Sequence, residues 1–169
     1  MRLSGLLVFI LATLAACATY DIPPPAPPPP PPPSYYVLRH LNTPAGERDP
    51  DLLPEGLRAA EALESWFRSR QVLRAIYVSD YRRTRQTAAP LAARLRLTPI
   101  VYDPADTPAL VARVRAGPLP ALIVGHSNTV SDIVEQLGGT RPGPLVHEDF
   151  GDMWLIGPDG ATVRVRIEP

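Results

Sequence analysis

The chain has 169 residues, and its 17 arginines, with no lysine, balance 17 acidic residues to a formal net charge of zero. Without an excess of positive charge to hold a polyanion, a general nucleic-acid-binding protein is disfavoured. The single cysteine, Cys17, lies near the N-terminus, which excludes internal disulfides, a cysteine zinc site and cysteine catalysis in the rest of the chain.

The first 16 residues have the pattern of a secretory signal. Arg2 supplies a positive start, and residues 6–14 form a nearly continuous apolar run. That run is too short to cross a bilayer, which takes about 20 residues. It fits instead the hydrophobic part of a signal peptide.

The run ends in Leu-Ala-Ala-Cys at residues 14–17, which resembles the lipobox of bacterial lipoproteins. The resemblance implies that residues 1–16 are removed and that Cys17 carries acyl chains such as palmitate. It places the protein in the bacterial cell envelope, anchored to a membrane by lipid. Because Ala18 rather than Asp follows the cysteine, the periplasmic face of the outer membrane is favoured. An ordinary secretion signal is the alternative.

Residues 17–33 are expected to form a linker, since ten of the 23 prolines lie between Pro23 and Pro33. Proline has a fixed φ and no backbone donor, so this stretch favours a polyproline II spacer of roughly 30 Å. A ligand for proline-recognition domains is the alternative. Residues 34–169 have the length of one domain, long enough to bury about two-thirds of its unfolded surface.

From residue 34 onward, β-prone runs alternate with helical patterns. The first half predicts a strand at 35–38, a helix over about 54–70, a strand at 75–78 and a helix over 84–95. The second half predicts a strand at 99–102, a helix over 108–115, a strand at 121–124, a helix over 130–137, and a terminal hairpin of strands 153–156 and 163–167. The alternation predicts a three-layer α/β/α fold whose central sheet is mostly parallel.

Some residues within the helices make these predictions more specific. Pro54 suits the first position of its helix, and Pro90 is expected to kink the next one. The first helix is expected to bury the face marked by Leu57, Ala60, Leu63 and Phe67. The last is expected to bury the stripe Val130, Ile133, Val134 and Leu137, and to end at Gly138-Gly139.

Two histidines and two arginines follow the predicted strands. Arg39 and His40 end the first strand, Arg83 follows the second, and His126 follows the strand at 121–124. In parallel sheets the ligand binds beyond the carboxyl ends of the strands. Because guanidinium groups match phosphate oxygens and a helix N-terminus after His126 also favours an anion, the set predicts a phosphate site. A histidine is available there as nucleophile, and no metal or organic cofactor is expected.

These residues lie in three ordered motifs that resemble those of the histidine phosphatase superfamily, also called phosphoglycerate mutase-like. The motifs are Val37-Leu38-Arg39-His40 with Thr43, residues 79–88, and residues 124–129; Asp51-Leu52 and Gly56 also fit. The resemblance implies that His40 becomes phosphohistidine, and that Arg39, Arg83 and His126 hold the phosphoryl oxygens. The other nitrogen of His40 should donate to a carbonyl, so that the attacking nitrogen is neutral.

The sequence departs from this family at two places. Leu41 stands where a small residue is usual, and we expect it at the rim of the pocket. The acid that protonates the leaving group is not obvious, because Ser127 follows His126. Asp106 is a candidate, with Asp103 beside it; the alternative is that both are turn and helix-cap residues. Short family members that act on phosphohistidine lack this acid.

The sequence therefore predicts a phosphatase that hydrolyses phosphomonoesters or phosphohistidine on small substrates or phosphoproteins. One alternative is a noncatalytic phosphate-binding lipoprotein of the same fold. Another is a phosphomutase, which 136 residues disfavour because little chain is left for a lid over the intermediate. Simpler roles are expected for other polar and aromatic residues: a surface position for His147, solvated side chains for Arg82 and Arg85, and core positions for Trp66 and Trp154.

Overall fold

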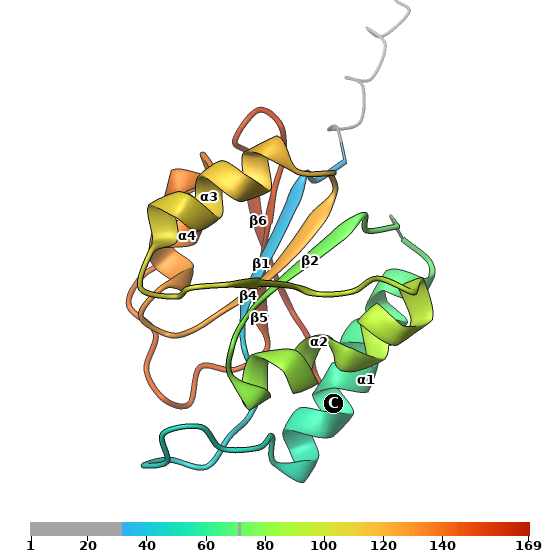
Figure 1. Cartoon of the computed structure of the whole chain (residues 1–169), viewed down its shortest axis with the longest axis vertical. Helices are drawn as coiled ribbons and strands as arrows, with labels where there is room; N and C mark the ends of the chain where they lie inside the picture. The colour runs from blue at the N-terminus through green and yellow to red at the C-terminus, as the bar shows by residue number, and fades with distance from the viewer. Residues whose placement is uncertain (1–31, 71) are drawn as a thin grey trace, which may run out of the picture.

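The computed structural model describes residues 32–70 and 72–169, which fold around a six-stranded sheet (Figure 1). Its elements are β1 (Tyr35–Arg39), α1 (Pro54–Arg68), β2 (Ala75–Ser79), α2 (Arg82–Leu95), β3 (Ile100–Tyr102), α3 (Thr107–Ala116), β4 (Ala121–Gly125), α4 (Val130–Gln136), β5 (Asp152–Ile156) and β6 (Thr162–Arg166). The predicted signal peptide, Cys17 and most of the predicted linker lie outside the described residues. Within those residues, no helix has the length and apolar character needed to span a membrane.

The strand order is β3-β2-β4-β1-β5-β6. The first four strands are parallel, and β5 and β6 are antiparallel to their neighbours, which confirms the predicted α/β fold and the terminal hairpin. β4 pairs with both β1 and β2, opposing Arg39 with Gly125 and Val78 with Val124. The carboxyl ends of β1, β2 and β4 therefore lie side by side.

Helices cover both faces of the sheet, as Figure 1 shows. Side chains alternate between the two faces along each strand. Tyr36 and Leu38 of β1 belong to a core shared with α1 and α2, whereas Val37 packs with α3 and α4 on the other side. β1, β2 and β4 are consequently buried on both faces, whereas the edge strand β3 is partly exposed.

The first helix begins at Pro54 as predicted, and Ala60, Leu63 and Phe67 of its predicted face are buried, but Leu57 is not. Leu57 is 49% exposed, while Ala59, Ala60, Leu63 and the small Gly56 are buried. Successive helical residues are about 100° apart, so a face centred on Gly56 and Ala60 turns Leu57 outward. The face is set by close packing of α1 on its neighbours, which the apolar pattern alone does not reveal.

The second helix continues through Pro90, which lies inside the assigned helix. A proline removes one backbone hydrogen bond there. The helix ends where Arg96 adopts a positive φ of 55°, a left-handed cap that donates its backbone N–H to the carbonyls of Ala92 and Ala93.

Gly56 gives a first testable prediction, because a Cβ at this position would lie 2.5 Å from the carbonyl oxygen of Asn42. That carbonyl also accepts a hydrogen bond from Leu53 N, so it has little freedom to move. We expect Gly56→Ala to lower the free energy of unfolding by about 1–3 kcal/mol, as overpacking does. Denaturant unfolding measures the difference.

Gly143→Ala is the matched control, since a Cβ there would meet no heavy atom within 4 Å. This substitution should change the free energy of unfolding by less than about 0.5 kcal/mol. Equal stabilities for the two variants would show that α1 does not pack closely against the segment that follows His40.

Candidate active site

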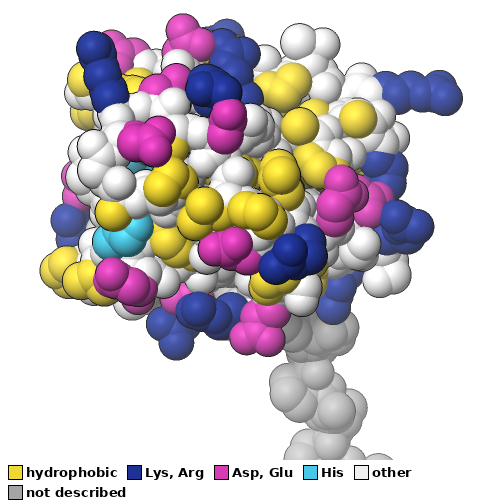
Figure 2. Space-filling view, turned by 90° about the horizontal axis from the view of Figure 1, so that it is seen from below, with side chains coloured by type: hydrophobic (Ala, Val, Ile, Leu, Met, Phe, Trp, Pro, Cys, Tyr) yellow, Lys and Arg dark blue, Asp and Glu magenta, His cyan; other side chains and the backbone are white. Residues whose placement is uncertain are grey.

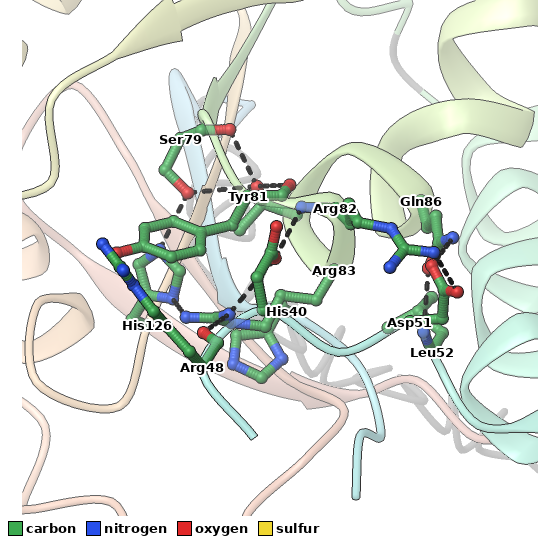
Figure 3. A network of polar contacts seen from close by, with 12 residues as sticks. His40, Arg48, Asp51, Leu52, Ser79, Tyr81, Arg82, Arg83, Gln86 and His126 are labelled. Carbon is green, nitrogen blue, oxygen red and sulfur yellow. Dashed lines mark hydrogen bonds and ion pairs between the residues drawn. The ribbon is translucent and has the colours of Figure 1, made fainter.

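A cavity of about 360 Å³ opens at the carboxyl ends of β1, β2 and β4. It is lined by His40, Tyr81, Arg83, Pro104, Ala105, His126, Ser127 and Asn128. The two imidazole rings lie 5.4 Å apart, and Arg83 contacts the ring of His126 (Figure 3). The structure therefore brings His40, Arg83 and His126 together from three separate segments of the chain; what each does chemically stays a prediction.

His40 is held with one ring nitrogen engaged and the other free to react. Its Nδ1 lies 2.9 Å from the carbonyl oxygen of Leu41, and Nδ1–H donates to that oxygen because a carbonyl can only accept. Nε2 then carries the lone pair. Burial, together with the weaker effect of the positive charge of Arg39, lowers the pKa of His40 to about 3, although the hydrogen bond to Leu41 acts in the opposite direction. The ring is thus neutral near pH 7, as nucleophilic attack requires.

A chain of hydrogen bonds fixes the tautomer of His126. Thr84 Oγ1 donates its proton to the backbone carbonyls of Ser79 and Tyr81, so the Ser79 hydroxyl must donate to Thr84. Ser79 Oγ, 2.8 Å from His126 Nε2, then accepts the Nε2–H proton. The remaining nitrogen, Nδ1, accepts from Arg83 Nη2 at 3.3 Å.

The environment of His126 keeps this ring neutral as well. Burial lowers its pKa to about 4, and the neighbouring charges of Arg83 and Arg39 act in the same direction. Asp49 opposes them more weakly. The free protein therefore presents two uncharged imidazoles beside two guanidinium groups.

Arg83 is clamped by groups that the sequence analysis did not single out. Its Nη1 donates to the carbonyl of Arg48 at 3.0 Å and lies 3.5 Å from Asp49 Oδ1. Its guanidinium carbon is 4.2 Å from the ring centre of Tyr81, which lines the cavity. Tyr81 lies inside the motif at 79–88, so the motif was the signal for it; Asp49 stands between two other acidic residues of its loop and has no such signal.

Arg39 lies beside both imidazoles, and a neighbouring loop engages its guanidinium. The side chain is buried, but its Nη1 donates to the carbonyls of Val146, His147 and Asp149 at 2.6, 3.0 and 3.2 Å. Its guanidinium also stacks 4.2 Å from the ring of Phe150. Arg39 is not among the residues that line the cavity, so it adds charge next to both imidazoles while one of its nitrogens holds the loop at 146–150. Its Nε is buried without a partner among the described residues.

Leu41 does not lie at the rim of the cavity, so that prediction is wrong. It is fully buried in the core shared with α1 and α2, and its backbone N–H donates to Thr87 Oγ1 at 3.0 Å. The chain turns inward directly after His40 and places the Leu41 side chain in the core instead of the cavity. Leu41 therefore leaves access to the cavity unchanged.

The structure favours the helix-cap role for Asp106 over the acid role. Asp106 Oδ1 accepts from Ala109 N at 3.0 Å and caps α3, and Asp103 Oδ1 accepts from Ala105 N at 2.9 Å. Pro104 and Ala105 line the cavity at this point, and neither can donate a proton. No residue that lines the cavity is an Asp or a Glu.

The other singled-out side chains lie away from the cavity. His147 is exposed, and Arg82 and Arg85 form exposed ion pairs with Asp51 and Asp80. Trp66 and Trp154 pack at the margin and in the interior of the two cores. Within the described ranges, no group of three His, Cys, Asp or Glu is arranged to hold a metal ion.

Comparison with known proteins agrees with the motifs. The model of the histidine phosphatase superfamily (branch 1) matches residues 35–105, and no curated protein matches the chain. The match covers less than half of the chain, and over that region the chain is similar to the histidine phosphatase superfamily, in agreement with the ordered motifs and with the shared fold.

Solved structures share the fold at low sequence identity. The protein histidine phosphatase SixA, in complex with tungstate, is 18% identical with a TM-score of 0.58, over 80% of this chain and 97% of that one. The alpha-ribazole phosphatase of Shigella flexneri is 13% identical with a TM-score of 0.56, over 80% and 96%. A mycobacterial glucosyl-3-phosphoglycerate phosphatase is 17% identical with a TM-score of 0.57, over 72% and 88%.

The two lowered histidine pKa values predict how stability depends on pH. In the unfolded chain both groups titrate near about 6.5. Between that pH and their folded pKa values, about 3 for His40 and about 4 for His126, the unfolded state binds more protons. The free energy of unfolding should therefore fall as pH is lowered from about 6.5 to 4, by up to about 1.4 kcal/mol per pH unit for each group.

Denaturant unfolding across this pH range, compared between variants, isolates the contribution of His40. His40→Gln should show a shallower slope than the wild type, whereas His147→Gln, with its exposed side chain, should keep the wild-type slope. Parallel slopes for all three proteins would mean that His40 is not kept neutral by burial.

Proposed function

We propose that this protein is a phosphatase that works through a phosphohistidine intermediate on His40. The observation that carries the proposal is the state of His40: a buried, neutral imidazole whose Nδ1–H is fixed on the Leu41 carbonyl, 5.4 Å from the ring of His126. Its free Nε2 is the nucleophile. Arg83 lies in the same cavity to receive the phosphoryl oxygens.

The reaction takes two steps. Nε2 of His40 attacks phosphorus, and the bond from phosphorus to the leaving group breaks as the N–P bond forms. A water molecule then attacks the phosphohistidine, which releases inorganic phosphate and restores His40. Because the transferred group is loosely bonded and negatively charged at the transition state, the positioned cations Arg83 and Arg39 supply most of the stabilisation.

His126 must change its protonation state to assist. In the free protein its Nδ1 is an acceptor, occupied by Arg83. When Arg83 turns to a phosphoryl oxygen, this nitrogen is released, and the nearby anion favours its protonation. The imidazolium can then donate to the phosphoryl group, so that substrate binding takes up a proton at His126.

The residues that line the cavity limit the range of possible substrates. With no carboxyl group among the lining residues, the leaving group must depart without a strong proton donor. Imidazole and acidic alcohols meet this condition, whereas simple alkoxides do not. We therefore favour phosphohistidine on a protein, or a phosphomonoester of an acidic alcohol, as the natural substrate. A solved structure of the same fold is a protein histidine phosphatase, which supports this choice.

A noncatalytic phosphate-binding protein is the second candidate, because one nitrogen of Arg39 is engaged by the loop at 146–150.

The setting we propose for either activity is the cell envelope. It rests on the resemblance of residues 14–17 to a lipobox, with Cys17 as the lipid anchor and residues 17–33 as the linker.

Hydrolysis of an aryl phosphate separates the two candidates, since its good leaving group needs no acid. We expect the wild type to release phosphate and His40→Ala to have no activity above background. Arg83→Gln should lose on the order of a hundredfold or more in rate, as loss of one transition-state donor does. Arg85→Gln is the matched control, exposed and paired with Asp80, and should keep the wild-type rate. Equal rates in wild type and His40→Ala would exclude the proposed mechanism.

The missing carboxyl group predicts a strong dependence on the leaving group. Steady-state kinetics should give a kcat/KM for a phosphohistidine peptide and for an aryl phosphate at least about a hundredfold above that for an alkyl phosphate, since a general acid contributes about 10²–10⁴. Comparable values for aryl and alkyl phosphates would reveal an acid that the cavity lining does not show.

A further inference from the structure

The end of the domain opposite the active site is rich in arginine. Helices α1, α2 and α3 end there, and strands β2, β3 and β4 begin there. The three segments that make these connections, residues 66–75, 92–100 and 112–121, contain no Asp or Glu. They contain seven arginines: Arg68, Arg70, Arg74, Arg94, Arg96, Arg113 and Arg115. We refer to these three segments as the basic pole.

The chain enters the domain at this same pole. Arg74 N donates to Pro120 O at 2.8 Å, and Ala121 N donates to Ser34 O at 3.1 Å. The starts of β1, β2 and β4 are therefore adjacent. Figure 1 shows the chain entering β1 at the top, while the loop after β1 lies at the bottom.

Some of these cations have an ordinary structural role, and others do not. Arginine at the C-terminus of a helix offsets the helix dipole. Arg68 and Arg94 also share the buried carboxylate of Glu64. By contrast, five of the seven have no carboxylate partner among the residues that the structure describes: Arg70, Arg74, Arg96, Arg113 and Arg115. Arg113 and Arg115 donate instead to the carbonyls of Val101 and Gln136.

Of these five, Arg70 lies against an aromatic ring, and two others are free of the contacts to neighbouring elements made by Arg113 and Arg115. Arg70 is stacked 4.2 Å from the ring centre of Trp66, and Val72 is 65% exposed. Arg74 and Arg96 are exposed. Helix dipoles do not explain Arg74, which lies between a helix and a strand, nor the absence of acidic residues from all three segments.

Acidic residues gather instead at the active-site end. The loops there carry Glu47, Asp49, Asp51, Asp80, Asp103, Asp106, Glu148 and Asp149. Seen from below, in Figure 2, the molecule shows Asp and Glu side chains among its arginines. Carboxylates are thus concentrated at the active-site end, although Arg48, Arg82, Arg83 and Arg85 lie there too and Asp159 lies at the other end, near Ser34.

We propose that the basic pole docks on an anionic phospholipid surface and thereby turns the active-site cavity away from the membrane. Arginines near such a surface are attracted to its negative charge, and an exposed apolar side chain between them can enter the interface. A bilayer is the partner that fits, because the chain that leads to the predicted lipid anchor at Cys17 leaves from this pole. The linker predicted at residues 17–33 would join this pole to the anchor.

The test uses the full chain on vesicles of phosphatidylcholine with or without phosphatidylglycerol. An environment-sensitive fluorophore is attached at Val72→Cys, in the basic pole, or at Val146→Cys, which replaces an exposed residue beside the loop that binds Arg39. Mass spectrometry verifies a single label. The Val72 label should shift to shorter wavelength only when phosphatidylglycerol is present, and roughly 1 M salt should abolish the shift. The Val146 label should not respond.

A charge-matched pair of triple variants tests the residues themselves. Replacing Arg70, Arg74 and Arg96 by Gln should weaken docking on the order of a hundredfold, from about fivefold for each arginine. Replacing Arg58, Arg82 and Arg85 by Gln removes the same charge elsewhere and should leave docking unchanged. An identical emission of the Val72 label on both kinds of vesicle, an equal response of the two labels, or equal losses in the two triple variants would overturn the proposal.

Discussion

The pairing of β4 with both β1 and β2 is the constraint on which the site depends. It places the ends of three strands next to one another, although the residues that follow them are separated by about 40 positions in the sequence. His40 donates its backbone N–H to the carbonyl of Gly125, the last residue of β4, so the proposed nucleophile is fixed to the strand that precedes His126. The distance between the two imidazoles is thus a property of the sheet rather than of the loops.

Burial and hydrogen bonding together prepare the two histidines for different tasks. Both rings are neutral because they are desolvated beside positive charge. Their tautomers differ. His40 carries its proton on Nδ1, which donates to the Leu41 carbonyl, and His126 carries its proton on Nε2, which donates to Ser79 Oγ. One ring therefore offers a lone pair from Nε2 and the other from Nδ1. The same electrostatic environment therefore suits both proposed roles: His40 as the nucleophile, and His126 as a group that takes up a proton when an anion enters the cavity.

Regular elements and the residues at strand ends were predictable from the sequence, whereas the loop contacts were not. Apolar periodicity identifies the strands, and the rule for parallel sheets places His40, Arg83 and His126 at one edge. The engagement of Arg39 depends on three carbonyls more than a hundred residues away, and no local pattern encodes it. Leu41 and Leu57 were misplaced for a related reason, since the direction of a chain after a strand and the packed face of a helix follow from neighbouring elements.

The distribution of charge bears on which phosphates can reach His40. The cavity attracts an anion through Arg83 and Arg39, but the loops at the active-site end carry several carboxylates. At physiological salt, screening limits electrostatic interactions to about 8–10 Å. A small, highly charged anion is therefore repelled first by the loop carboxylates and attracted by the arginines only when it is close to the cavity. A phosphoryl group on a larger carrier can bring compensating cationic surface to those carboxylates. This distribution of charge agrees with the proposal above that the substrate is a phosphoprotein.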